Sequence, residues 1–366
     1  PAGRFSVRKV SHDTLERPGP EGTLSFLNDR LKVEGNWNIF PPSPVYFSVD
    51  LTIADGATQG VITANQDWTS LPAKNDLDLI APGIGDLRIS GEMKAEALLK
   101  IAGPVLVPRL AVALRQTNIS SREKALDVTG IAGTVLVDSL DPLTTPGDQV
   151  ITIEKIRSGN FTAEKGRIAF RLEDRDRMFL ESMQLQLPQG GTVAIRGARF
   201  NLADQSARLD LFLENVDFVA LLARLTDGKI NGTGLVHGRI PLAYENGRLL
   251  LDSGYIYALP GTGRLGIRDK DWMNMLMLYV NEAMRGHPYL SVVAERMEQA
   301  LQDFIYDYLT VDFTRVGVET KARVELRGAG ATGDPPQEIG SMVLNINDLE
   351  ELLNRAIGFS MTSEES

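Results

Sequence analysis

The sequence has no cysteine in 366 residues and only three histidines, His12, His237 and His287. The lack of cysteine excludes thiolate catalysis, cysteine-ligated metal and disulfide bonds together. No two histidines are spaced four residues apart, and neither an HExxH nor a GxSxG motif occurs. A chain without cysteine fits an oxidising compartment such as the periplasm, and a reduced cytosol also accommodates one.

Positive charge is also scarce. Lysine and arginine number 38 against 48 aspartates and glutamates, which gives a formal net charge of −10. Proteins that bind nucleic acid neutralise phosphates with clustered lysine and arginine. We therefore expect no nucleic-acid partner.

No apolar run approaches the roughly 18 residues that a membrane-spanning helix needs. The nearest is LLKIAGPVLVPRLAVAL (98–114), which contains Lys100, Arg109 and two prolines. The chain starts at Pro1 without a basic segment followed by an apolar one. If the protein is tethered to a membrane, we expect the tether to lie upstream of residue 1.

The strongest positive signal is a two-residue alternation of apolar and polar side chains in short runs, which is typical of strands with one buried and one wet face. In VGVETKARVELRG (316–328) the apolar set is Val316, Val318, Ala322, Val324 and Leu326. Similar runs occur at 30–35, 150–156, 166–172, 192–200 and 207–213, and hairpin-like pairs occur at Gly190-Gly191, Asp227-Gly228 and Asn246-Gly247. The fold class predicted is mainly β: an elongated, curved, mostly antiparallel sheet that forms a groove, with a few amphipathic helices near the C-terminus.

Helical spacing is confined to a few segments. Asp217 is a candidate N-cap for a helix that stops at Gly228. Further helices are expected after Asp271, from Ser291 through Phe304, Ile305 and Tyr308, and from Asn347 to Gly358. The predicted division is 1–90 as an N-terminal β segment, 91–268 as a β-groove domain, and 269–366 as a helical hairpin, β hairpin and closing helix.

Two motifs with possible chemistry have simpler structural explanations. GTGRLG (261–266) matches GxGxxG, but the acid expected about 20 residues on is replaced by Gly286, so a tight turn is favoured over a dinucleotide site. Glu173, Asp174 and Asp176 alternate with arginines, as in a solvated hairpin tip, and calcium would need a denser oxygen cluster. We expect no metal, no cofactor and no catalysis, the rival being a hydrolase with isolated carboxylates.

Three blocks resemble the YdbH family of the AsmA-like superfamily, whose C-terminal domain has also been labelled "dicarboxylate transport". In 129–172 the pattern is carried by Leu140, Pro142, Leu143, Thr145, Pro146 and Gln149. The block 232–267 resembles the family's "G-x-L-x-G-x-x-P-L" and Gly-rich close. The block 300–328 carries its helix-to-strand junction at Ala300, Leu301, Phe304, Tyr306 and Leu309. The strand and helix of 344–353 complete the resemblance over 85–360, with Gly328-Ala329-Gly330 departing from the usual "G-x-N-P".

The resemblance implies a periplasmic protein, anchored to the inner membrane, that moves phospholipid between the two membranes through a hydrophobic groove. A water-soluble diacid would need no apolar groove, and the sequence shows no cluster of arginines for one. The candidate lining is the apolar set of central strands: Ile168, Phe170, Leu172, Val193, Ile195, Leu209, Leu211 and Leu213. The alternative is an envelope scaffold or secretion-related protein whose β core is closed.

The resemblance also implies a small outer-membrane lipoprotein as partner at the C-terminal end. An open antiparallel sheet ends in unpaired backbone groups that a partner strand can satisfy. We expect the edge to lie around Val318–Leu326 and Met342–Ile346. The alternative is that the helix expected at 348–357 covers this edge.

Overall fold

The computed structural model describes residues 2–12, 15–38, 43–54, 56–71, 87–122, 125–159, 161–204, 206–225, 228–245, 248–259, 263–271, 273–274, 296, 298–316, 319–331 and 338–346. These residues are mainly β, and every pairing given below is antiparallel. The chain divides into two compact units, one of residues 1–156 and 167–181 (unit 1) and one of 157–166 and 182–366 (unit 2). The division predicted at residues 90 and 268 stays a prediction.

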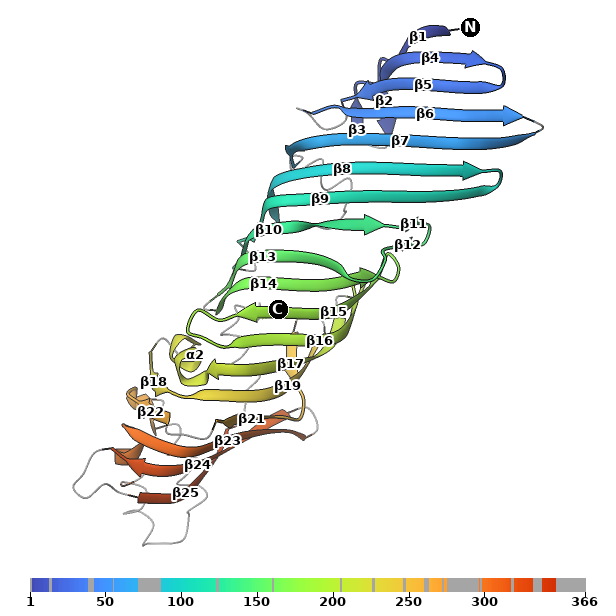
Figure 1. Cartoon of the computed structure of the whole chain (residues 1–366). Helices are drawn as coiled ribbons and strands as arrows, with labels where there is room; N and C mark the ends of the chain where they lie inside the picture. Colours follow the sequence, from blue (N-terminus) through green and yellow to red (C-terminus); the bar gives the residue numbers. More distant parts are fainter. Residues whose placement is uncertain are drawn as a thin grey trace, which may run out of the picture. The chain divides into compact units, whose positions relative to one another are not determined.

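Unit 1 is built from successive hairpins, with each strand of the series β4 to β10 paired to the next and β1 paired to β4 (Figure 1). Its strands are β1 Ala2–Ser6, β2 Val10–His12, β3 Leu15–Arg17, β4 Glu21–Leu27, β5 Arg30–Trp37, β6 Val45–Ala54, β7 Ala57–Ser70, β8 Arg88–Ala102, β9 Val105–Ser121, β10 Leu126–Val137, β11 Ser139–Leu140 and β12 Leu143–Thr144. Three strands contribute residues to both units: β13 Gln149–Ser158, β14 Phe161–Leu172 and β15 Arg177–Gln186.

Unit 2 continues with longer-range pairings, in which β17 pairs with β16 and β19, β21 with β19 and β23, and β24 with β23 and β25. Its elements are β16 Thr192–Asn201, β17 Ser206–Asp217, α2 Phe218–Leu225, β18 Ile230–Thr233, β19 Leu235–Glu245, β20 Arg248–Leu251, β21 Gly254–Ala258, β22 Gly263–Ile267, β23 Phe304–Val316, β24 Glu319–Gly330 and β25 Glu338–Ile346. The mainly β, antiparallel architecture predicted from alternation is confirmed.

The segment 98–114, the nearest approach to a membrane-spanning run, forms most of a hairpin instead. Its residues belong to β8 and β9, which are joined at Gly103-Pro104. Among the described residues, no helix reaches the length and hydropathy needed to cross a membrane.

Two predictions near the C-terminus are wrong. The alternating run 316–328 is not one strand, because Val316 ends β23 and pairs with Glu319 at the start of β24. The helix expected through Phe304, Ile305 and Tyr308 ends earlier, since β23 begins at Phe304. Most of the other segments expected to be helical after Asp271, including 347–358, lie outside the described residues.

The helix expected between Asp217 and Gly228 is confirmed as α2. The Asp217 carboxylate accepts a hydrogen bond from the Ala220 N–H at 3.0 Å, as an N-cap side chain does. At the other end the Gly228 N–H donates to the Ala223 carbonyl at 2.6 Å, and Gly228 has a left-handed backbone with a φ of 79°. Gly228 therefore closes a helix and does not form a hairpin turn between two strands.

The third family block supplies the core of unit 2. Ala300, Leu301, Phe304, Tyr306 and Leu309 are all buried, at 0 to 5% exposure. Burial raises the pKa of the Tyr306 hydroxyl to about 12, and this hydroxyl donates to the Thr233 carbonyl at 3.3 Å. The helix-to-strand junction of this block is thus a packing motif.

The glycines of GTGRLG serve this packing. Gly263 and Gly266 lie in strand β22, not in the tight turn expected, and no helix opens at Gly266. A Cβ on Gly263 would overlap the ring of Tyr306, which crosses directly over the glycine. The motif therefore makes room for an aromatic core residue.

We expect Gly263→Ala to lower the free energy of unfolding by about 1–3 kcal/mol, because the added methyl overpacks the Tyr306 ring. Chemical denaturation of the purified chain measures this change. Gly3→Ala is the matched control, since a Cβ there meets no atom within 4 Å. Equal stability of the two variants would contradict the packing account.

Candidate lipid-binding surface

One face of the unit 1 sheet is apolar along its whole series of strands. The register of the antiparallel pairs places side chains of successive strands in rows, called rungs here. One rung runs through Leu24, Val33, Val49, Ile62 and Leu99. The rungs beside it contain Leu31, Leu51 and Ile101 on one side and Phe47, Ala64, Ala97 and Leu110 on the other. These twelve residues are called the unit 1 apolar face.

None of the twelve side chains is fully buried. Leu24 is 43% exposed and the other eleven are half-buried. The face extends over six strands from β4 to β9, about 24 Å at roughly 4.8 Å per strand. The face is therefore continuous and partly accessible, which makes it a candidate interaction surface.

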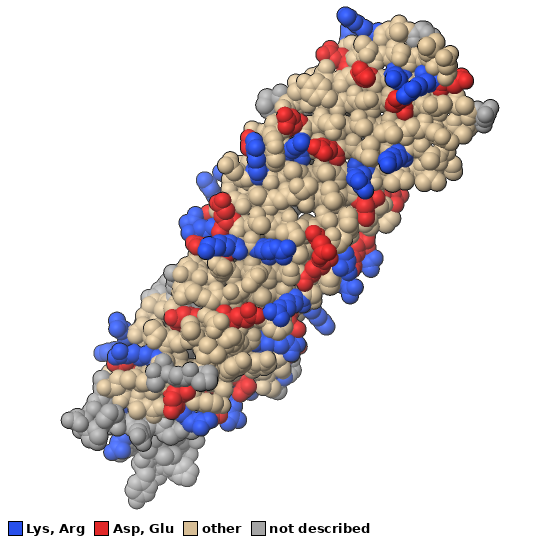
Figure 2. Space-filling model, viewed as in Figure 1, with Lys and Arg blue, Asp and Glu red and all other residues tan. Residues whose placement is uncertain are grey.

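The opposite face of the same strands is polar and carries cross-strand ion pairs. The Arg30 guanidinium contacts both Asp50 carboxylate oxygens at 2.6 Å, and Arg115 contacts Glu92 at 2.5 Å. The hydrogen bond from Arg30 lowers the pKa of Asp50 below its usual value. Figure 2 shows basic and acidic side chains lying beside one another, so no surface of one sign appears in this view. The face of unit 1 that carries the ion pairs is therefore the one suited to contact with solvent.

The corresponding apolar face in unit 2 is covered. Its rungs cross β16, β17, β21, β23 and β24 through residues that are almost wholly buried: Val193 and Ile195, Leu213, Ile256, Val311 and Phe313, and Ala322 and Leu326. Their exposed fractions lie between 1 and 7%. The opposite face again carries ion pairs, Arg196 with Glu214 and Arg239 with Asp210. Most of this face is therefore more deeply buried in unit 2 than in unit 1, although Leu211 of β17 is half-buried.

The eight predicted lining residues are divided between these environments. Ile168, Phe170 and Leu172 of β14 lie in unit 1 and are half-buried. Leu209 and Leu211 of β17 are also half-buried, whereas Val193, Ile195 and Leu213 are only 4 to 6% exposed. Val193 pairs with Leu213, and Ile195 with Leu211, so the alternation assigned these four to one face correctly. Their contact with lipid stays a prediction.

The predicted lining does not include the unit 1 apolar face. A signal for this face is present in the sequence, because VYFSVDLTI (45–53) alternates with the same period of two. Alternation defines the two faces of a strand. It gives no information on whether the apolar one is covered.

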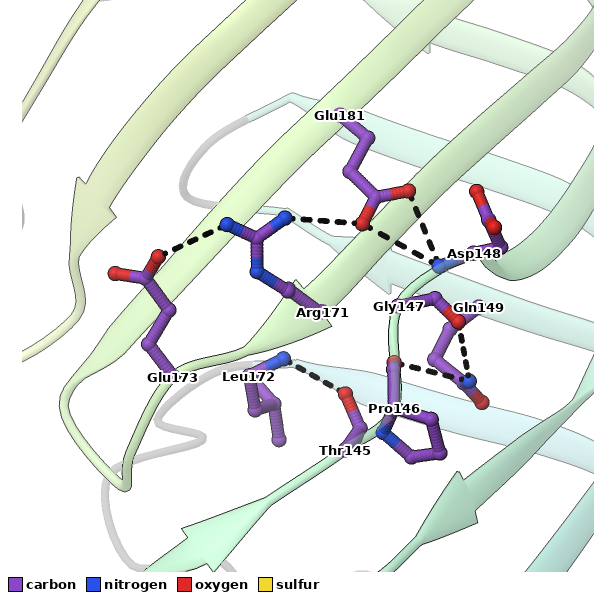
Figure 3. A network of polar contacts seen from close by, with 9 residues as sticks. All are labelled: Thr145, Pro146, Gly147, Asp148, Gln149, Arg171, Leu172, Glu173 and Glu181. Carbon is purple, nitrogen blue, oxygen red and sulfur yellow. Dashed lines mark hydrogen bonds and ion pairs between the residues drawn. The ribbon is translucent and has the colours of Figure 1, made fainter.

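The first family block forms a polar clasp within unit 1 (Figure 3). Thr145 is 5% exposed, and its hydroxyl accepts a hydrogen bond from the Leu172 N–H at 2.8 Å. The Thr145 N–H in turn donates to the Leu172 carbonyl at 3.2 Å. These reciprocal bonds fasten the loop after β12 to the end of β14.

Gln149 organises the same loop from inside. Its side-chain amide donates to the carbonyls of Pro146 and Gly147 at 3.1 and 3.2 Å. Its side-chain oxygen accepts from the Leu136 N–H of β10 at 2.7 Å. Gln149 is itself only 5% exposed, so these hydrogen bonds satisfy the polar atoms of a buried side chain and tie the loop to β10.

Charged residues complete the clasp. Arg171 contacts Glu181 at 3.2 Å and Glu173 at 3.3 Å, and its guanidinium lies 4.2 Å from the centre of the Phe179 ring. Glu181 also accepts from the Asp148 N–H at 3.1 and 3.3 Å. The family motif thus holds strands β10, β13, β14 and β15 together at one loop, which is a structural role.

The acidic run at 173–176 is a hairpin tip, as predicted. The turn between β14 and β15 is closed by Asp174, whose carboxylate accepts from the N–H groups of Asp176 and Arg177 at 2.9 and 2.8 Å. The hydrogen bond from the Arg177 side chain lowers the pKa of this carboxyl.

His237 stacks on Tyr257 with ring centres 5.9 Å apart. Within the described ranges, no three histidine or acidic side chains gather as metal ligands would.

Comparison with known families gives one match. A family model described as YdbH-like, "Intermembrane phospholipid transport protein YdbH", matches residues 29–285. This range includes β5 to β22, and therefore most of the unit 1 apolar face and the clasp. No curated protein and no solved structure matches the chain.

We expect Gln149→Ala to lower the free energy of unfolding by about 1–3 kcal/mol, because it removes a buried side chain that forms hydrogen bonds with the Leu136 N–H and with the carbonyls of Pro146 and Gly147. Gln184→Ala, at an exposed position of β15, should change stability by less than about 0.5 kcal/mol. Denaturant titration of both variants measures the difference. A Gln149 variant as stable as the Gln184 variant would show that the clasp does not stabilise the sheet.

Proposed function

The chain belongs to the YdbH-like family, and we propose that it carries phospholipid between two membranes with the acyl chains lying on the unit 1 apolar face. Membership implies intermembrane phospholipid transport as the general activity. Our proposal adds the surface that holds the lipid and the manner of transfer, a continuous bridge along a hydrophobic β-groove.

The observation that supports this proposal is the uncovered apolar face itself. Each acyl CH₂ removed from water contributes about 0.8 kcal/mol, so a partly sheltered chain gains several kcal/mol without any polar contact. The face extends about 24 Å across its strands, whereas one leaflet of a bilayer is about 15 Å thick in its hydrocarbon part. One acyl chain therefore fits on it with room to slide.

The alternative function, an envelope scaffold with a closed β core, is favoured by the covered face of unit 2. There the rungs from Val193 to Ala322 are buried and offer no acyl chain a place in this conformation. The two readings are compatible if unit 2 is the structural part and unit 1 the binding part. A lipid assay with residue-level resolution separates them.

Family membership also guides the proposed location. We propose that the chain lies in the periplasm and is anchored to the inner membrane by a segment upstream of residue 1. We further propose that it catalyses no reaction, since moving a lipid along an apolar surface makes and breaks no covalent bond.

A small outer-membrane lipoprotein remains our proposed partner, with a narrower docking position. Strand β24 pairs with both β23 and β25, so its residues Glu319–Leu326, which belong to the edge expected from the sequence, do not offer a free strand edge. Strand β25 pairs with β24 on one side, and we propose that a partner strand extends the sheet on its other side. Strand addition uses backbone hydrogen bonds, so it requires little specificity in the partner's sequence.

A photo-crosslinking amino acid at Leu99 should capture phospholipid, and the same amino acid at Leu98 should not. The two leucines are adjacent in β8, but Leu99 pairs with Pro108 on the apolar face and Leu98 with Arg109 on the polar face. Mass spectrometry of the irradiated protein, expressed in bacteria and purified, measures the adduct. We expect at least a tenfold excess at position 99.

The same residue at position 213 tests the predicted lining in unit 2, where Leu213 is 4% exposed. Capture at 213 but not at 99 would move the binding surface to unit 2. Equal capture at 98 and 99 would indicate unspecific lipid contact and contradict the proposal. No adduct at any of the three positions would favour the scaffold.

Deleting residues 339–366 should abolish capture of the lipoprotein partner, because it removes β25 after its first residue. The deletion should leave lipid crosslinking at Leu99 unchanged, since that residue belongs to unit 1. The matched control ends the chain at Ile346, which retains β25. Pull-down with the tagged partner measures capture, and partner binding that survives the longer deletion would place the docking site elsewhere.

A further inference from the structure

The tip of the β8–β9 hairpin exposes a short apolar wedge. Val105, Leu106 and Val107 are consecutive and are 55, 60 and 51% exposed. They follow the two-residue turn Gly103-Pro104 and open strand β9, where they pair with Ala102, Ile101 and Lys100 of β8. Three neighbouring apolar side chains that are more than half exposed have no role in a core.

The wedge lies beyond the end of the ladder between β9 and β10. The register of β9 with β10 ends at the pair Leu110 and Val137, so residues 105–109 pair only with β8. At about 3.4 Å per residue, five residues extend roughly 17 Å past the end of that ladder. On the other side, the tips of the next two hairpins expose Leu27 at 70% and Ile53 at 43%.

Two cations flank the wedge at its base. Lys100 and Arg109 are exposed and lie on the polar face, where Lys100 pairs with Val107 in the register. No acidic residue occurs between positions 97 and 114. Neither cation forms an ion pair with any residue in the described ranges.

The spacing of apolar tip and cations matches the depth of a membrane interface. Lys100 precedes the turn at Gly103 by three residues, about 10 Å along the strand. Apolar segments that lie in the interface are buried about 5–10 Å, while lysine and arginine remain at the anionic headgroups. Asp29 at the β4–β5 tip would be repelled by these headgroups, so insertion centres on the β8–β9 tip.

We propose that the β8–β9 tip inserts into the surface of a bilayer that contains anionic phospholipid. Val105, Leu106 and Val107 enter the boundary between headgroups and acyl chains, and Lys100 and Arg109 contact the phosphates. This contact does not depend on lipid transfer along the unit 1 apolar face. Together with such transfer, it would place a bilayer leaflet beside the surface that accepts the acyl chain.

Flotation of the full chain with vesicles tests the insertion. One vesicle preparation is pure phosphatidylcholine, and the other contains equal parts of phosphatidylcholine and phosphatidylglycerol. Val105→Asp/Val107→Asp should lower partitioning onto the anionic vesicles at least tenfold. Lys100→Gln/Arg109→Gln should lower it about 25-fold, which is roughly fivefold for each cation lost, and should have little effect with phosphatidylcholine.

Leu202→Asp is the matched control, because Leu202 is 47% exposed in the turn after β16 and has no part in the wedge. It should float like the wild type. Circular dichroism and thermal unfolding confirm that each variant is folded. Unchanged flotation of folded Val105→Asp/Val107→Asp would overturn the proposal. So would a change of oligomeric state in that variant without vesicles, which would assign the tip to contact between copies.

The result is separable from that of lipid capture. Val105 and Val107 lie off the unit 1 apolar face, so crosslinking at Leu99 with detergent-dispersed phospholipid should be the same in the wild type and the double aspartate variant. Loss of flotation with intact crosslinking supports insertion as a separate property. Flotation without any crosslinking at Leu99 would retain the wedge and reject the proposed function.

Discussion

The two-residue period of the β-strand, imposed on one face of an antiparallel sheet, is the constraint on which the rest of this structure depends. Each strand presents alternate side chains to opposite faces, and hydrogen bonding to the next strand brings like positions into one row. The apolar rows of β4 to β9 and the ion pairs Arg30–Asp50 and Arg115–Glu92 are two results of this geometry. The apolar face is stabilised when it is removed from water by packing or by binding. The face that carries the ion pairs is compatible with solvent.

The two units meet this constraint differently. In unit 2 most members of the apolar rows are buried, and so are the apolar residues Ala300, Leu301, Phe304, Tyr306 and Leu309. In unit 1 every member of the apolar face retains some exposure. Exposed apolar surface costs roughly 25 cal/mol for each Å², so a partly exposed face carries a free-energy cost that a bound acyl chain would reduce under the proposed function. The same pattern would then stabilise unit 2 and give unit 1 its proposed capacity to bind.

Alternation predicted the strands well because a half-buried strand has a distinctive period, as at 166–172 and 207–213. The helix predicted through residues 304–308 is wrong because the apolar residues there fit helical spacing. The segment forms strand β23, whose alternation is interrupted by an irregularity in the register. The register shifts between Tyr306 and Tyr308, so the inward residues are Phe304, Tyr306 and Leu309 and no simple alternation appears. The candidate site is harder to predict from the sequence than the strands. Whether an apolar face is buried depends on residues far away in the chain. Val193 and Val49 have the same local pattern, and only the fold makes one buried and the other half-exposed.

The residues with specific polar or packing roles belong to the scaffold, and the chemistry of the proposed ligand would explain why. Thr145 and Gln149 hold a loop by directional hydrogen bonds, and Tyr306 fills a space bounded by Gly263, so each needs a specific side chain. An acyl chain has no donor, acceptor or charge. A surface that binds it needs only apolar side chains on the correct face, so Val, Leu and Ile would serve equally at Val49, Ile62 or Leu99. Sequence motifs would therefore arise where the strands are held together by specific contacts, while a face of the proposed kind is specified by its period of two.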